Sequence, residues 1–355
     1  MKGFISSALL GAAVGTMTLG SFAWAQELQE VNIMTPNRGS CSMYPQFVTD
    51  KLGFWEKEGI KVNLLPSETT VPYIAFLENG DADLVMLDSG QVLQAVDVGK
   101  PIKVVYEAFN FAPEGIVVTA DSPIQGLADL KGTTIGMASD RDLITTVIAL
   151  DSIGETLESF NVTTVVVGDS GPVMASALTN KTIDAFAGGA SDRAGIEAAG
   201  VQIRNITPPE VSQNPGNSLT AWGPTIEEKR PLIEKLLRGW AQAQHAGVVD
   251  TKLVASVCRD ALPEQFENIQ NGLRMINNSV YSTQLRRTKD YGELQPDVWS
   301  KIQAPYVKQK EISKELDPSG FLDDSFIEAA NAWTLMDVKN AIQAWKDANA
   351  DKIIN

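Results

Sequence analysis

The stretch FLENGDADLVMLDSG, residues 76–90, has a looser copy further along the chain, ALTNKTIDAFAGGASD, residues 177–192. The residues that match in spacing are Leu77, Asn79 and Asp83 in the first copy and Leu178, Asn180 and Asp184 in the second. An Asn near the end of a helix favours a left-handed turn, and the short apolar run that follows is typical of a buried strand. Each copy ends on Gly, Ser and Asp. The repeat therefore predicts two equivalent helix–strand units whose polar ends lie at the rim of one cleft.

Strand and helix patterns alternate along the chain on both sides of these copies. Strands are expected over residues 31–35, 60–67, 82–88, 102–108, 116–120, 133–138, 163–168, 183–189 and 201–207. An interrupted helix is expected over residues 42–59, and further helices over residues 72–80, 89–99, 126–132, 141–154, 171–180 and 192–200. This alternation is typical of parallel sheets with helices on both faces. The predicted fold class is α/β, with mostly parallel sheets flanked by helices.

Two segments rich in Pro, Gly and Asn interrupt the alternation, at residues 109–115 and 208–218. From Thr225 onward the patterns are chiefly helical, and Thr225 and Glu228 have the spacing of a capping box. Further helices are expected to start near Pro263, Pro296 and Leu335.

The composition excludes several classes of function. The 355 residues are enough for two lobes, and the net charge of −15 disfavours binding to the phosphate backbone of nucleic acids. One His and two Cys cannot supply a Cys/His metal cluster, so neither a metal nor a cofactor is expected. Cys41 and Cys258 could pair or remain buried thiols, and we favour the free thiols.

The N-terminus has the layout of a secretory signal peptide. Lys2 precedes a run of apolar and small residues that closes on Ala23-Trp24-Ala25. Cleavage is expected near Ala25, so residues 1–25 would be removed and the mature protein would reside in the periplasm.

Three phrases resemble a known family. KLGFWEKEGIKVNL (residues 51–64), LENGDADLVMLD (77–88) and IQGLADLKGTTIGM (124–137) resemble, in order and spacing, extracytoplasmic solute-binding proteins of ABC importers. The branch is the sulfonate, nitrate, taurine and thiamine-precursor type, and the resemblance covers about residues 31–220. The C-terminal helix has no counterpart in it.

The resemblance implies a two-lobed periplasmic-binding-protein fold of type II. Lobe I would comprise residues 26–112 and 215–355, including a helical tail, and lobe II residues 113–214. The protein would be a monomer that closes on a small-molecule solute by rotation about two crossings and delivers it to a membrane permease. No catalysis is implied.

Candidate ligand-binding residues lie where polar loops follow the predicted strands, because strand ends and helix N-termini line such clefts. They are Asn37, Arg38, Tyr44, Ser67, Glu68, Thr69, Asp88, Ser89, Asn110, Ser139, Asp140, Arg141, Ser170, Ser191, Asp192, Asn217 and Trp222, with Phe109 as a further aromatic. The alternative for each is a helix cap, a turn or simple packing.

The identity of the solute stays open at this level. Arg38 and Arg141 could clamp a sulfonate or carboxylate, while the acids on the same rim suit an amine. We favour a small sulfonate such as taurine or a similar zwitterion, with a thiamine-pyrimidine precursor or an aromatic acid as alternatives. An enzyme that shares the fold, or a binding protein that serves a receptor, are the rival functions.

Overall fold

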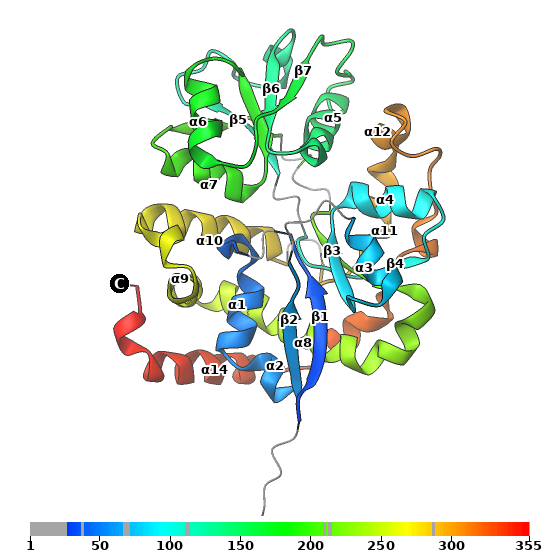
Figure 1. The fold of residues 1–355 in the computed structure, drawn as a ribbon, viewed down its shortest axis with the longest axis vertical. Helices are drawn as coiled ribbons and strands as arrows, with labels where there is room; N and C mark the ends of the chain where they lie inside the picture. Colours follow the sequence, from blue (N-terminus) through cyan, green and yellow to red (C-terminus); the bar gives the residue numbers. More distant parts are fainter. Residues whose placement is uncertain are drawn as a thin grey trace, which may run out of the picture.

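The computed structural model describes residues 27–36, 39–66, 72–110, 114–208, 211, 215–285 and 288–354. The predicted signal peptide, residues 1–25, lies outside this part of the chain. Two lobes, each built on one sheet, are stacked along the long axis of the molecule (Figure 1). Within the described residues, no helix combines the length and the apolar character needed to cross a bilayer.

The sheet of lobe I has the strand order β2-β1-β3-β10-β4. The bounds are β1 Gln29–Met34, β2 Ile60–Leu64, β3 Leu84–Leu87, β4 Ile102–Glu107 and β10 Ser218–Trp222. β1 runs parallel to β2 and β3, whereas β10 is antiparallel to both β3 and β4. β10 was not among the predicted strands, because it begins at Ser218, the last residue of the segment rich in Pro, Gly and Asn.

The sheet of lobe II has the strand order β7-β6-β8-β5-β9. Its strands β7, β6 and β8 occupy the same positions as β2, β1 and β3 in the sheet of lobe I. The bounds are β5 Gly115–Thr119, β6 Thr134–Met137, β7 Thr163–Val166, β8 Ala185–Gly188 and β9 Ile203–Asn205. β6 is parallel to β7 and β8, and β5 is antiparallel to β8 and β9. Each sheet thus contains one strand, β10 or β5, that reverses the parallel arrangement.

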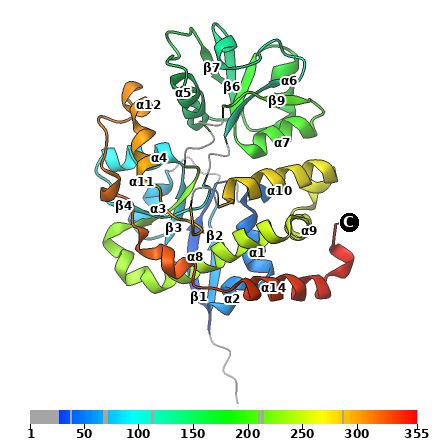
Figure 2. The same ribbon diagram turned by 180° about the vertical axis from the view of Figure 1, so that it is seen from behind.

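Helices cover both faces of each sheet. In lobe I they are η1 Cys41–Met43, α1 Tyr44–Lys51, α2 Phe54–Lys57, α3 Tyr73–Asn79, α4 Ser89–Asp97, α8 Ile226–Val249, α9 Thr251–Ala261, α10 Ile269–Thr283, α11 Pro296–Lys301, α12 Gln303–Lys308, α13 Ile327–Ala330 and α14 Leu335–Ala348. In lobe II they are η2 Leu127–Leu130, η3 Asp140–Asp142, α5 Leu143–Asp151, α6 Gly171–Thr179 and α7 Ala190–Ala198. The C-terminal helix α14 lies along lobe I, against α8 (Figures 1 and 2).

The strands are buried on both faces, and alternate residues enter different cores. In β3, Leu84 and Met86 belong to one apolar cluster while Val85 and Leu87 belong to another. This period of two is what a central strand between two helical layers requires. The alternating burial explains why the strands read as short continuous apolar runs in the sequence.

The repeated Asp residues have the same structural role in the two lobes. Asp83 accepts a hydrogen bond from Asn32 N (2.7 Å), and Asp184 accepts one from Thr134 N (2.8 Å). Each carboxylate thereby ties the start of its own strand to the neighbouring parallel strand, β1 or β6. The left-handed turn comes one residue after each repeated Asn, at Gly80 (φ 78°) and at Lys181 (φ 56°). The sequence echo therefore reports two equivalent helix–turn–strand units.

We expect Asp83→Ala to cost about 1–2 kcal/mol of unfolding free energy, because it removes a strand-tying bond and the 2.7 Å ion pair with Lys229. Asp184→Ala, which removes the equivalent bond alone, should cost about 1 kcal/mol. Urea unfolding of the mature protein measures both. Asp81→Ala, at an exposed position two residues away, is the control and should leave the midpoint unchanged. Equal midpoints for all three variants would contradict the assigned role.

Of two local predictions, one is confirmed and one is wrong. The interrupted helix expected over residues 42–59 is present as η1, α1 and α2, and Gly53 separates the last two with φ 69°. The capping box at Thr225 is wrong, since this residue makes no side-chain cap bond and its hydroxyl donates to the Trp222 carbonyl instead (3.4 Å). A 3-10 turn, η5 Gly223–Thr225, leads into α8 and gives Thr225 a backbone conformation unsuited to capping.

The two cysteines are free thiols buried in one apolar cluster of lobe I. Burial, together with a hydrogen bond between the two side chains, raises the pKa of Cys258. The free thiols agree with the state favoured from the sequence.

Candidate functional site

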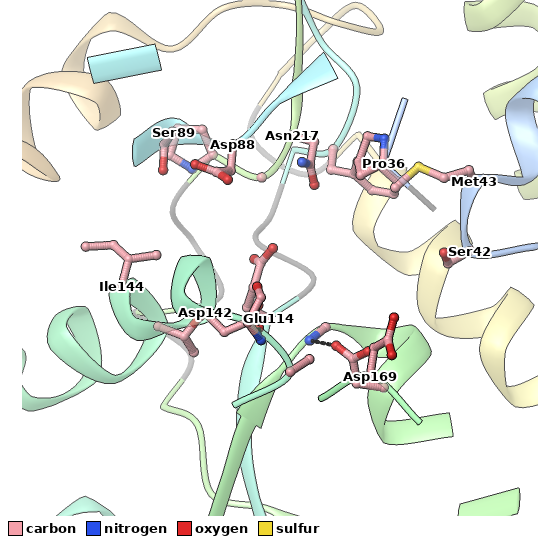
Figure 3. Close-up of a pocket in the computed structure, with 18 of the residues that line it drawn as sticks. Pro36, Ser42, Met43, Asp88, Ser89, Glu114, Asp142, Ile144, Asp169 and Asn217 are labelled. Carbon is pink, nitrogen blue, oxygen red and sulfur yellow. Dashed lines mark hydrogen bonds between the residues drawn. The ribbon is translucent and has the colours of Figure 1, made fainter. Parts of the chain in front are cut away.

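A cavity of about 410 Å³ lies between the lobes and is lined by residues of both. Figure 3 shows Asp88, Ser89 and Asn217 of lobe I on one side and Glu114 and Asp142 of lobe II on the other. Pockets that hold small molecules commonly have volumes of about 300–1,000 Å³. The cavity is therefore large enough for a small organic solute.

The directions of the strands bring these side chains together. Asp88 directly follows β3, and Asp142 lies in the turn after β6. Glu114 and Asn217 instead precede β5 and β10, the strands that run antiparallel to their neighbours. An antiparallel strand presents its amino end at the edge where its neighbours present their carboxyl ends. The carboxyl ends of the parallel strands and the amino ends of the antiparallel strands therefore meet at the same cavity.

Five carboxylates line the cavity. They are Asp88, Glu114, Asp142, Asp169 and Asp192. Among the side chains that the structure describes, no Lys or Arg is part of the lining. The guanidinium of Arg193 offsets part of the repulsion at Glu114 and Asp192. The lining is therefore acidic among the residues that the structure describes.

Three of the acids cap helices at the rim. Asp88 Oδ1 accepts from Gln91 N at the start of α4, Asp142 Oδ2 from Ser139 N at η3, and Asp192 Oδ2 from Gly189 N at α7, each at 2.8 Å. Such short polar residues are favoured before helices because they satisfy the free N–H groups of the first turn. Asp88 is the N-cap of α4 and bonds to an N–H group of its first turn. Asp142 and Asp192 are instead the third residues of η3 and α7, and they bond back to the backbone N–H groups of the N-cap residues.

Burial shifts the titration of two of the acids. Removal from water, with further contributions from Asp88 and Asp142, raises the pKa of Glu114 to about 7. Burial, with Asp142 and Asp169 acting in the same direction, raises the pKa of Asp192 to about 6. Both groups therefore favour the protonated form more than an exposed carboxyl would.

This gives an expected pH dependence of stability. Because the pKa of Glu114 in the folded protein is above its ordinary value of 4.5, its contribution is fully present below pH 4.5 and is lost as the pH rises through about 7. The unfolding free energy of the solute-free protein should therefore fall between pH 5 and pH 8, and by less in Glu114→Gln. Thermal unfolding across this range measures the difference. Glu158→Gln, at an exposed position, is the control. If it reduced the pH dependence of stability as much as Glu114→Gln does, the assignment to Glu114 would be wrong.

Two neutral polar side chains at the cavity make no hydrogen bond with the described residues. Asn217 and Thr145 line it with only 9% and 3% of their surfaces exposed. Within the described part of the chain, no hydrogen bond engages the Asn217 amide or the Thr145 hydroxyl. Buried polar groups are normally paired, so these two are suited to bind a molecule in the cavity.

The lobes also contact each other outside the cavity. α10 of lobe I packs against α7 of lobe II, where Arg274 pairs with Glu197 (Figure 2). On the other side, Lys308 Nζ lies 3.1 Å from Asp151 Oδ1. The two lobes thus contact each other on both sides of the cavity.

Among the residues predicted from the sequence, the structure brings one group to the cavity. Those that line it are Asp88, Ser89, Ser139, Asp192 and Asn217, together with Phe109.

A second group does not line it. Tyr44 is fully buried inside lobe I, where its hydroxyl lies 2.9 Å from Thr283 Oγ1. Asn110 is 3% exposed and donates to the Gln284 carbonyl. Asp140 and Ser170 are exposed, and Trp222 packs against the apolar cluster around Trp299. The predictions for Asn37, Arg38, Ser67, Glu68 and Thr69, and for the side chains of Arg141 and Ser191, fall outside the described residues.

Sequence reasoning missed several lining residues. Glu114 lies in the punctuated segment before β5, and the reversed direction of that strand is not visible in the residue pattern. Asp142 lies two residues beyond the predicted Asp140 in the same turn, η3, and of these two only Asp142 lines the cavity. The run of acids after predicted strands was a usable signal, since Asp169 follows β7 in the same way.

The arrangement of the acids does not suit a metal ion. No group of three or more His, Cys, Asp or Glu side chains within the described residues has the closeness required to hold one. The carboxylates are instead distributed over two walls of the cavity.

A family model described as "NMT1/THI5 like" matches residues 41–248, more than half of the chain. No curated protein matches the chain in sequence. Among solved structures, the periplasmic aliphatic sulphonate binding protein SsuA of Escherichia coli is similar, with a TM-score of 0.63, 15% identity and coverage of 82% of this chain and 91% of that one.

Two further structures share the fold. The alkanesulfonate-binding protein SsuA of Xanthomonas axonopodis pv. citri, bound to MOPS, gives a TM-score of 0.62 at 14% identity and covers 85% of this chain and all, 100%, of that chain. The desulfurization enzyme DSZB gives 0.54 at 14% identity, with 88% and 99% covered. At these identities the likeness concerns the fold alone, and this fold is the two-lobed one of periplasmic binding proteins.

Proposed function

The chain belongs to the NMT1/THI5-like family, and from this premise we propose that it is the periplasmic solute-binding component of an ABC importer. It captures a small organic solute between its two lobes and delivers that solute to a membrane permease. The observation that carries the proposal is the cavity of about 410 Å³, which is lined by both lobes and contains the Asn217 amide and the Thr145 hydroxyl, neither of them hydrogen-bonded to a described residue. Because each lobe supplies part of the lining, a solute can contact the whole lining only when the two lobes approach each other.

The proposed lobes are residues 26–112 with 215–355, and residues 113–214, which places the two crossings side by side. The backbones beside these crossings are joined by two hydrogen bonds of 3.1 Å, from Phe109 N to the Asn217 carbonyl and from Gly216 N to the Phe109 carbonyl. A rotation about this pair opens the cavity at the side where Arg274 pairs with Glu197. Opening would break that ion pair and the one between Lys308 and Asp151.

Capture by closure requires that the solute bind the closed form more tightly than the open form. To change the closed fraction from 1% to 99%, the binding free energies of the solute for the two forms must differ by about 5.5 kcal/mol. Smaller changes in the closed fraction need a smaller difference. Exposed ion pairs contribute about 0–1 kcal/mol each. The two inter-lobe pairs therefore cannot hold the empty protein closed by themselves, and contacts inside the cavity supply the rest.

The proposed ligand-contacting residues are those of the predicted set that line the cavity, from Asp88 to Asn217, together with Glu114, Asp142 and Thr145. The proposed state is a monomer, exported through the cleaved signal peptide. The candidate solutes are taurine-like sulfonates, other zwitterions, aminopyrimidine vitamin precursors and aromatic acids.

A binding assay that also detects chemical conversion tests this function. The mature protein is mixed with representatives of these four classes, thermal shifts are recorded, and the solutes are then recovered and analysed by mass spectrometry. A solute at 100 times its Kd adds about 2.7 kcal/mol of stability, which moves the transition by several degrees. We expect a one-to-one complex from which the solute is recovered unchanged. Conversion of the solute would instead support the enzyme alternative, for which the fold has the precedent of DSZB.

A further inference from the structure

We propose that the captured solute carries a positive charge, as an organic ammonium or amidinium group, and that this charge sits between the carboxylates of the two lobes. The inference rests on the proposed function and names the chemical class of its solute. It covers cations and those zwitterions whose amine enters the cavity, and it excludes sulfonates and carboxylates that carry no amine.

The first support is the charge of the walls. The acids come from both lobes, with Asp88 on one side and Glu114 and Asp142 facing it (Figure 3). No described lining side chain is basic, and Arg193, which acts on Glu114, is outside the lining. An anion brought into this space would meet like charges in a medium of reduced dielectric, where repulsion is stronger than in water. A cation would meet attraction from both walls.

The second support is the state of the helix N-termini. Anions commonly bind at such ends because the N–H groups of the first turn lack partners. Here a first-turn N–H group of α4 already donates to Asp88, and at η3 and α7 a carboxylate, Asp142 or Asp192, itself lies in the first turn and accepts from the N-cap N–H group. An anionic solute would have to displace these carboxylates to reach the same donors.

The third support is the availability of uncharged acceptors. Asn217 exposes only 9% of its surface, and its side chain faces the cavity. This side chain has no hydrogen-bond partner among the described residues. Its amide oxygen, and the hydroxyl of Thr145, can accept from N–H groups of a solute. An ammonium or amidinium has several such donors, so the neutral acceptors and the carboxylates can bind it together.

The size and the apolar walls indicate an organic cation and not a metal ion. The acids do not form a metal-holding cluster within the described residues, and the space of about 410 Å³ far exceeds one ion. Met43, Phe109, Ile144 and Ile148 line the same cavity. The aromatic face of Phe109 can contact a cation, and the aliphatic side chains can cover the hydrocarbon part of the solute.

The charge also couples binding to closure. When the lobes approach each other, Asp88 of lobe I comes near the acids of lobe II and raises the pKa of Glu114. In the empty protein this approach is opposed by repulsion. A positive charge between the walls converts the repulsion into attraction, so the cation binds the closed form preferentially.

The test is a matched panel of solutes that differ in charge. Benzylammonium, benzamidinium, benzyl alcohol, benzoate and benzenesulfonate share one ring, and taurine is paired with ethanesulfonate. Calorimetry at pH 8 compares wild type with Glu114→Gln, and with Glu158→Gln as an exposed lobe II control. We expect binding only from amine or amidine compounds. Glu114→Gln should weaken it about 10-fold to 100-fold, because one charge-assisted contact is lost, and Glu158→Gln should not.

The pH profile provides a second readout. Glu114, near Asp88 and Asp142 and the guanidinium of Arg193, has to lose its proton to pair with a cation. Affinity for the amine should therefore rise from pH 5 to pH 8 by up to about 100-fold, and by less in Glu114→Gln. An affinity that falls over this range would overturn the inference.

The outcomes separate the two proposals. Binding of ethanesulfonate, benzoate or benzenesulfonate at the level of the amines leaves solute capture in place and overturns the positive charge. Amine binding that Glu114→Gln and Glu158→Gln weaken equally also overturns it. If no compound of any charge binds, solute capture itself fails, and the inference with it.

Discussion

Asn217→Lys is expected to abolish solute binding and to close the protein without a solute. Asn217 lies at the cavity opposite Glu114, and its side chain makes no hydrogen bond within the described residues (Figure 3). A lysine at this position would place a permanent ammonium among the acids of both lobes. It would act as an internal substitute for the cation that we propose. We expect the affinity for the best amine of the panel to fall at least about 100-fold, because the pocket charge is already neutralised.

Asn217→Met is the matched control, since methionine has a similar length and no charge. It should weaken binding through the lost amide, yet leave the closed fraction of the empty protein unchanged. The backbone carbonyl of residue 217, which accepts from Phe109 N at 3.1 Å, is retained in both variants. Calorimetry measures the affinity, and small-angle scattering measures the closure. If Asn217→Lys bound amines as well as Asn217→Met does, the ammonium would not occupy the solute position.

Glu107→Ala is expected to cause the largest loss of stability. Glu107 is 0% exposed and accepts three hydrogen bonds from the segment that begins α11, from Gln295 N (3.1 Å), Gln295 Nε2 (2.9 Å) and Trp299 Nε1 (2.8 Å). Removing the acceptor leaves these donors buried beside a cavity. We expect a loss of about 3–5 kcal/mol in unfolding free energy, as is typical when one partner of a buried charged network is removed.

Glu107→Gln retains one acceptor oxygen at nearly the same shape and should lose clearly less stability than the alanine variant. Urea unfolding compares the two. Trp299 is fully buried near this contact, so its fluorescence should report the same transition. A loss under 1 kcal/mol for Glu107→Ala would show that α11 is held to β4 by apolar packing alone, and that the buried acid is dispensable.

The sequence predicted the layout of the fold because both sheets are made of short runs buried on two faces. Such runs, separated by helices that end on Gly, are visible in composition alone, as at Gly80 after α3. β10 was missed because it begins at the last residue of the segment rich in Pro, Gly and Asn and has no helix before it. Its antiparallel direction depends on tertiary pairing with β3 and β4, which a residue pattern does not record.

The site was predicted less completely, for a physical reason. A polar residue after a strand lies near the cleft, but the local turn decides whether its side chain enters the cavity. Asp140 and Asp142 occupy the same turn, and only Asp142 is part of the lining. Tyr44 begins α1 and points into lobe I, where Thr283 bonds to its hydroxyl. Rotations of this kind are set by packing against distant segments and not by the neighbouring residues.

The sign of the charge in the cavity could also not be predicted from the sequence. Acids and arginines alternate along the predicted rim, as in the run from Asp140 to Asp142, which suits a zwitterion as well as a cation. In the folded chain, carboxylates from five separate segments converge on one space. The sign of the site is therefore a property of the tertiary structure.

The distance between the lobes, with and without a solute, tests the central claim most directly. Spin labels at Asn277→Cys on α10 and Val173→Cys on α6 lie in different lobes, and both native cysteines are buried. Pulsed dipolar spectroscopy records the distribution of distances between them. We predict a long and broad distribution for the empty protein, which becomes shorter and narrower when the best-binding amine of the panel is added. A distribution that stays the same while calorimetry shows the amine bound would contradict capture by closure of the two lobes.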